Sequence, residues 1–188
     1  MIEPQFTDAI AVLKAGHRAA EDLFERFEAT RSPARRRKLA GQICALWKSQ
    51  IALEASLFYP ALRGRIADDL LDRACSLHAQ AAGLVAAVEA GEGGEGSGIG
   101  DAGLAVMVAR LTRAVRGQIA EDERFAEGIF ALGRRAGADL VRLRDAMLAR
   151  GAAMAAPLGQ ALSGSSLSGS SLSGLQSTPA AGLRLVAA

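Results

Sequence analysis

The 188 residues of this chain are half apolar, and their charged groups sum to a formal net charge of +2. This length suits one domain with a sizeable core, and the near-balanced charge argues against a nucleic-acid binder or a membrane-surface binder. Alanine, leucine and glycine dominate while aromatic and β-branched residues are sparse, so the composition favours an all-helical fold.

Apolar residues at three- and four-residue spacing predict two helices in the first third of the chain. The first runs from Thr7, a suitable N-cap, to about Thr30. The second begins at Ser32, a cap followed by Pro33 in the first turn, and we expect Pro60 to end it. Each helix has one apolar stripe, as expected for a helix that packs on one face.

Two more long helices are predicted beyond residue 65. A glycine-rich turn, residues 91–100, separates a helix over about 66–90 from one that starts at Asp101 and runs to about Arg135. The apolar stripe of this last helix includes Phe125. Short connections between the four long helices favour an up-down-up-down four-helix bundle.

A fifth, shorter helix is predicted over about residues 139–154, and a low-complexity segment follows it. From residue 157 onward a five-residue unit of Ser, Gly and Leu repeats without charge. Isolated leucines among such residues cannot bury enough surface to fold, so we expect this tail to be disordered. The sequence therefore predicts a helical bundle over residues 1–156 and a tail over 157–188.

Six polar residues interrupt the apolar stripes of the four long helices, one or two in each helix. They are His17, Gln50, Glu54, His78, Gln118 and Asp122. The two histidines are the only ones in the chain, and each glutamine precedes a carboxylate by four residues, which places both side chains on one helix face. An antiparallel bundle would bring all six to one level of the core.

Two buried carboxylates, Glu54 and Asp122, would cost several kcal/mol each unless something compensates their charge. In one interpretation metal ions neutralise them, with the neutral imidazoles of His17 and His78 as nitrogen ligands. In the other no metal is present: protonated histidines balance the carboxylates, and the glutamine amides donate hydrogen bonds to them. The residue types alone leave both interpretations open.

Four segments of the chain resemble the helix signatures of the hemerythrin-like (HHE cation-binding) domain family. They are DAIAVLKAGHRAAEDLFERFE, ICALWKSQIALEASLFYPAL, RACSLHAQAAGLVAAVEA and VRGQIAEDERFAEGIFALGRR. The resemblance covers about residues 6–150, and its most specific part is Glu54 followed by LFYPAL. It implies a four-helix bundle with a non-haem iron centre that binds oxygen or nitric oxide, senses a redox signal or handles iron.

The resemblance also implies which residues would hold metal. The two histidines match those of the family's first and third helices, and the two carboxylates match those of its His-x-x-x-Glu motifs. Gln50 and Gln118 stand at the histidine positions of these motifs, and Gly16 stands where relatives often have an aspartate. Because an amide oxygen is a weaker metal ligand than imidazole, the set suits one metal ion better than two.

We therefore expect a metal-binding or sensing protein rather than an enzyme, with a metal ion and a small gas as its partners. Neither nucleic acid nor membrane is an expected partner. The alternative is a metal-free bundle that acts as a structural or protein-interaction module. Cys44 and Cys75 form no metal-spacing motif and no signal segment precedes the first helix, so we expect a reduced, cytoplasmic protein.

Overall fold

The computed structural model describes residues 6–92 and 100–164, and every regular element in these ranges is a helix. In chain order they are α1 (Ala9–Ala29), α2 (Pro33–Leu53), the π-helical turn η1 (Glu54–Phe58), α3 (Tyr59–Leu62), α4 (Asp68–Glu92), α5 (Asp101–Asp122), α6 (Ile129–Arg135) and α7 (Leu140–Gly164). The predicted all-helical fold is confirmed for these residues. None of the helices described is long and apolar enough to cross a membrane.

The helix starts follow local capping chemistry. Ser32 accepts a hydrogen bond from the backbone N–H of Arg35, and Pro33 lies in the first turn of α2, so the predicted start is confirmed. For α1 the predicted cap is wrong by one residue: Asp8, not Thr7, accepts from the N–H of Ala11. A carboxylate at this position also interacts favourably with the helix dipole.

The second predicted helix is interrupted by a π turn before it ends. The N–H of Tyr59 donates to the carbonyl of Glu54, five residues earlier. Pro60, the expected end, lies inside α3, and the helix continues to Leu62. Because proline has no N–H, it makes no α-helical bond at this point, and the wide turn directly precedes it.

The fourth predicted helix is two helices, and its predicted stripe is wrong at Phe125. Helix α5 ends at Asp122, and the chain turns before α6 begins after Gly128. A Cβ at Gly128 would lie 2.5 Å from the backbone oxygen of Asp122, so this close turn requires glycine. Phe125 is on the turn and 95% exposed. Ala126 beside it has a φ of 62°, which continuous helix excludes.

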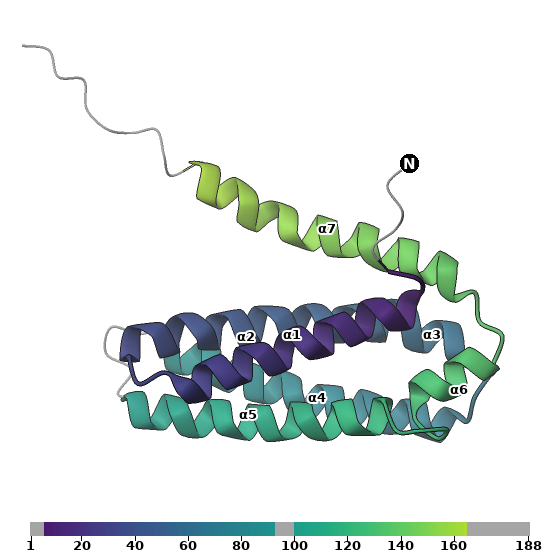
Figure 1. The fold of residues 1–188 in the computed structure, drawn as a ribbon, viewed down its shortest axis with the longest axis horizontal. Helices are drawn as coiled ribbons and strands as arrows, with labels where there is room; N and C mark the ends of the chain where they lie inside the picture. Colours follow the sequence, from purple (N-terminus) through teal and green to yellow (C-terminus); the bar gives the residue numbers. More distant parts are fainter. Residues whose placement is uncertain (1–5, 93–99, 165–188) are drawn as a thin grey trace, which may run out of the picture. The chain divides into compact units, whose positions relative to one another are not determined.

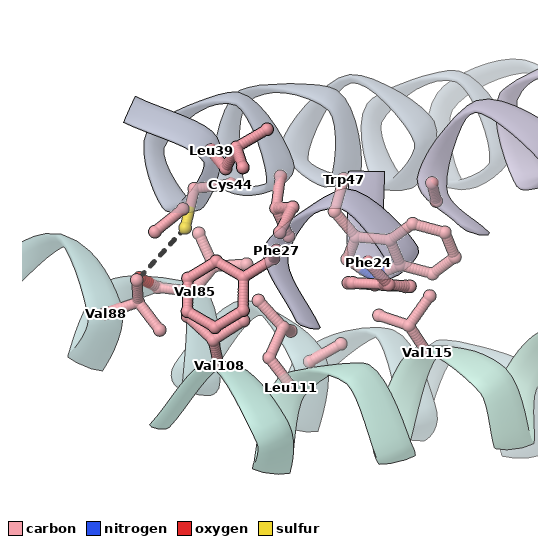
Figure 2. Close-up of a cluster of buried hydrophobic side chains, with 14 of the residues drawn as sticks. Phe24, Phe27, Leu39, Cys44, Trp47, Val85, Val88, Val108, Leu111 and Val115 are labelled. Atoms are coloured by element: carbon pink, nitrogen blue, oxygen red, sulfur yellow. Dashed lines mark hydrogen bonds between the residues drawn. The ribbon is translucent and has the colours of Figure 1, made fainter. Parts of the chain in front are cut away.

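The four long helices α1, α2, α4 and α5 lie side by side (Figure 1). Their apolar stripes meet in cluster I, whose aromatic and aliphatic side chains interdigitate (Figure 2). Cluster I includes Phe24, Phe27, Leu39, Ile43, Cys44, Trp47, Val85, Val88, Val108, Leu111 and Val115. Full burial of each large side chain contributes about 1.5–3 kcal/mol, so this packing supplies much of the driving force for folding.

A second apolar group, cluster II, combines residues from the start of α1, the end of α2, η1, α3, α4, α6 and the first half of α7. It includes Ile10, Leu13, Leu53, Phe58, Tyr59, Leu62, Leu71, Ile129, Phe130 and Met147. On α1 and α4, His17 and His78 fall between positions of cluster I and positions of cluster II. At the ends of α2 and α5, the polar residues follow the last cluster I positions, and α3 and α6 then contribute to cluster II. The polar residues therefore form a layer between two apolar clusters.

Helix α7 begins on the bundle and runs further than predicted. Met147 is buried in cluster II, and the guanidinium of Arg144 donates to the backbone oxygens of Phe6 and Thr7. Instead of ending near Met154, the helix continues through Pro157 to Gly164. The chain divides into units Met1–Met154 and Ala155–Ala188, and the predicted tail beyond residue 164 lies outside the described residues, as does most of the glycine-rich turn.

Candidate metal centre

All six predicted site residues are buried in the interior of the helical unit. They are His17, Gln50, Glu54, His78, Gln118 and Asp122, and we call them the polar layer. Thr112 is the other buried polar residue among those described, and its hydroxyl donates to the carbonyl of Val108 in its own helix. The layer is thus the one place in the described core where polar side chains meet between helices.

The Glu54 carboxylate contacts two other residues of the layer and one tyrosine outside it. Its carboxylate lies 2.8 Å from the Tyr59 hydroxyl, 3.2 Å from the Gln50 amide nitrogen and 3.0 Å from His78 Nε2. Burial alone raises the pKa of the Glu54 carboxyl, but the close imidazoles of His17 and His78 outweigh burial and lower it below its usual value. Glu54 is therefore a fully buried carboxylate that stays ionised.

His17 is held by a carboxylate on its outer side. Its Nδ1 lies 2.8 Å from Glu123 Oε1, and Lys14 pairs with the other oxygen of Glu123 at 2.9 Å. Burial lowers the pKa of His17, but Glu54 and Glu123 reverse that effect and raise it above the usual value. His17 Nε2 faces the interior, where it lies 3.6 Å from Glu54 Oε1 and has no hydrogen-bond partner among the described residues. If a metal replaced the proton on Nε2, Nδ1 would still donate to Glu123.

Asp122 is the second carboxylate of the layer and lacks the donors that Glu54 has. It is 1% exposed, and its Oδ2 has no hydrogen-bond partner within the described ranges. Burial and the nearby charge of Glu54 raise the pKa of Asp122 well above its usual value. Of two carboxylates that share a buried site, the one with more donors is ionised first, so Asp122 is the one that needs a further partner.

The remaining two residues play different parts. His78 Nε2 contacts Glu54 and lies 3.5 Å from the Tyr59 hydroxyl, while its Nδ1 is buried without a partner among the described residues. Both polar atoms of the Gln118 amide are likewise buried without a hydrogen-bond partner there. Gln118 nevertheless lies close enough to Asp122 to lower the pKa of that carboxyl slightly against the effect of burial.

Comparisons of the chain with protein-family models, with curated proteins and with solved structures find no match. What the centre can bind is therefore inferred from its own atoms. His17, Glu54 and Asp122 each offer one ligand atom, and these atoms lie within 4.8 Å of one another. A nitrogen with two carboxylate oxygens is a donor set suited to a first-row divalent metal such as iron.

The unpartnered atoms fit such an ion. A cation among the three groups would give His17 Nε2 and Asp122 Oδ2 the partners they lack and would offset two buried negative charges. Glu123 would hold the imidazole of His17 from outside, the usual arrangement for a histidine ligand. His78 is not part of the group of three, although its Nε2 reaches Glu54.

Two contributors were missed by the sequence reasoning. Tyr59 is buried, and its hydroxyl donates to Glu54. The signal was available, because a buried tyrosine hydroxyl needs a partner. Glu123 was missed because, in a continuous helix, it would lie on a different face from Asp122. Helix α5 ends at Asp122, however, and the Glu123 side chain reaches His17.

Gly16 provides the space that Gln50 occupies. A Cβ at residue 16 would lie 2.2 Å from Gln50 Oε1 and 2.5 Å from its Cδ, while Gln50 Nε2 donates to the carbonyl of Leu13 at 3.3 Å and to Glu54. The Gln50 amide therefore packs directly on the α1 backbone, where a larger residue at position 16 would displace it.

Gly16→Ala is expected to destabilise the protein by about 1 kcal/mol, measured by denaturant unfolding. Alanine gains about 0.5–1 kcal/mol of helix propensity, but overpacking and the two lost hydrogen bonds of Gln50 cost more. The matched control is Gly83→Ala on α4, where an added Cβ meets nothing within 4 Å. It should raise stability, and equal gains from both variants would contradict the close contact.

Proposed function

We propose that this chain is a hemerythrin-like metal-binding protein in which one iron ion or a similar divalent ion is held by His17, Glu54 and Asp122. The single observation that carries the proposal is the meeting of one imidazole and two carboxylates in a buried layer, with unpartnered atoms on two of them. The resemblance of four segments, which contain these residues, to the family signatures also supports it. The four long helices would then form the family's up-down-up-down bundle.

The other residues of the layer, together with residues that surround it, would position these ligands. Gln50, Tyr59 and His78 hold the Glu54 carboxylate, and Glu123 with Lys14 orients His17. Gln118 lies beside Asp122 and offers a neutral amide oxygen as a further metal ligand. When bound, a ferrous ion would supply reversible binding of a small gas or a one-electron change, which suits a binding or sensing role.

Metal content tests the proposal. Protein purified without chelators and reconstituted with ferrous iron is expected to hold about one ion per chain by mass spectrometry. His17→Gln should abolish binding because it removes the only nitrogen of the three-ligand group. His78→Gln is the contrast: it acts through Glu54, so metal should remain bound with about 10–100-fold lower affinity. Equal loss in both variants would argue for a ligand set that includes both histidines.

A second candidate is a metal-free structural or interaction module, and one observation favours it. Glu54 already has hydrogen-bond donors from Tyr59 and Gln50 and a close imidazole from His78, so this carboxylate is stabilised by protein groups alone. In that case no ion binds after reconstitution, and the wild type and His17→Gln give the same metal content. Asp122 would then be held protonated in the layer, in accord with its raised pKa.

A further inference from the structure

A cavity of about 360 Å³ opens between α4, α5 and α6, and Asp122 forms part of its wall. Its volume lies within the range of small-molecule sites. Much of the lining is apolar: Leu70 and Leu77 from α4 and Leu132 from α6 contribute to it and are half-buried. Half-buried leucines that line a cavity offer an apolar surface that a ligand could cover.

Two arginines on the same wall have no acidic partner. Arg73 from α4 and Arg135 from α6 both line the cavity, and within residues 6–92 and 100–164 neither has a carboxylate oxygen within 4.0 Å. Arg135 donates one hydrogen bond to the carbonyl of Ala126. Neither guanidinium is therefore held in an ion pair by the described residues around it.

The two glutamates of the cavity make their ion pairs with a different arginine. Glu121 and Glu127 also line the wall, but both lie against Arg124 instead, Glu127 at 4.0 Å. Asp122 is buried at the inner side, and its Oδ2 lacks a hydrogen-bond partner among the described residues. The wall thus combines apolar side chains, two unpaired guanidiniums and one buried unpartnered oxygen.

We propose that this cavity binds a small carboxylic acid with an apolar chain. The carboxylate pairs with Arg73 and Arg135, because a guanidinium matches a carboxylate with two parallel hydrogen bonds. The chain covers Leu70, Leu77 and Leu132. A neutral ligand would leave both guanidiniums unpaired, and a compact inorganic anion would leave the leucines exposed, so the wall favours a ligand that has both parts.

Octanoate is the probe for the test, and its binding to the metal-free full-length chain is measured by isothermal titration calorimetry. We expect one saturable site per chain. Arg73→Gln should weaken octanoate binding at least about tenfold, because it removes one charge-assisted contact. The neutral analogue 1-octanol should bind the wild type more weakly by a similar factor. Arg110→Gln, an exposed arginine of α5 that does not line this cavity, should leave the affinity unchanged.

Backbone amide shifts in nitrogen-15 NMR spectra give the location of the bound probe. They are expected to concentrate on residues 70–77 of α4 and 129–135 of α6. Absence of saturable binding, equal affinity for 1-octanol, an unchanged affinity in Arg73→Gln or shifts elsewhere would each overturn the proposal. Because Arg73 is exposed, its substitution leaves the fold intact, which an unchanged melting temperature verifies. The titration uses no metal, so its outcome is independent of the metal content measured above.

Discussion

Glu54→Ala is expected to lower the free energy of unfolding of the metal-free protein by about 3–5 kcal/mol at neutral pH. Removing one partner of a buried charged group has this cost because the others are left uncompensated. Here the substitution would leave Tyr59, Gln50 and His78 without the acceptor that they share. Urea denaturation in the presence of a chelator measures the loss.

The matched control is Glu89→Ala. Glu89 is an exposed carboxylate that pairs with Lys48 at 2.5 Å, and exposed pairs contribute only about 0–1 kcal/mol. Glu54→Gln keeps the shape and one acceptor oxygen, so its loss should lie between those of the two alanine variants. A loss for Glu54→Ala no larger than that of the control would show that the layer does not depend on this carboxylate.

Asp122→Asn is expected to act in opposite directions on the two forms of the protein. In the metal-free form it should raise stability by about 1 kcal/mol at pH 7, because it removes a buried carboxylate that lacks donors. With metal present it should remove the stabilisation by the ion, about 2.7 kcal/mol for the wild type at a free metal concentration 100 times the Kd. Melting curves with and without ferrous iron under anaerobic conditions measure both.

The pH dependence provides the internal check on this variant. The pKa of the Asp122 carboxyl is higher in the folded protein than in the unfolded chain, where it is about 3.9. The stability that Asp122 contributes is therefore fully present below the unfolded-state pKa and is lost as the pH rises through the folded-state pKa. The advantage of Asp122→Asn in the metal-free form should therefore grow from about pH 4 upward. Asp22→Asn, an exposed aspartate paired with Arg26, should show no such growth.

The positions of the polar layer could be predicted from the sequence because the information is local. An apolar stripe fixes which face of a helix is buried, so a polar residue that interrupts the stripe must be buried with it. This holds for His17 and for Gln118, and all six residues are buried as expected. The stripe does not determine which residues of different helices contact one another.

The features that could not be predicted depend on contacts between distant parts of the chain. Glu123 meets His17 across 106 positions, and its reach depends on where α5 ends. Helix α5 ends where it does because the chain makes a close turn at Gly128. The three- and four-residue spacing of apolar residues does not reveal this turn, so Phe125 was wrongly assigned to the buried face of a continuous helix. Which of the six residues are near enough to share one ion likewise depends on packing.

The π turn η1 has a consequence for aligning this chain with any relative. Leu62 follows Glu54 by eight positions, whereas two α-helical turns contain about 7.2 residues, yet both side chains are fully buried. The extra residue is taken up in the wide turn, which keeps Glu54 and Leu62 on the same side. A homologue with a regular helix here would therefore be one residue shorter, and a correct alignment must place a single gap within residues 54–58.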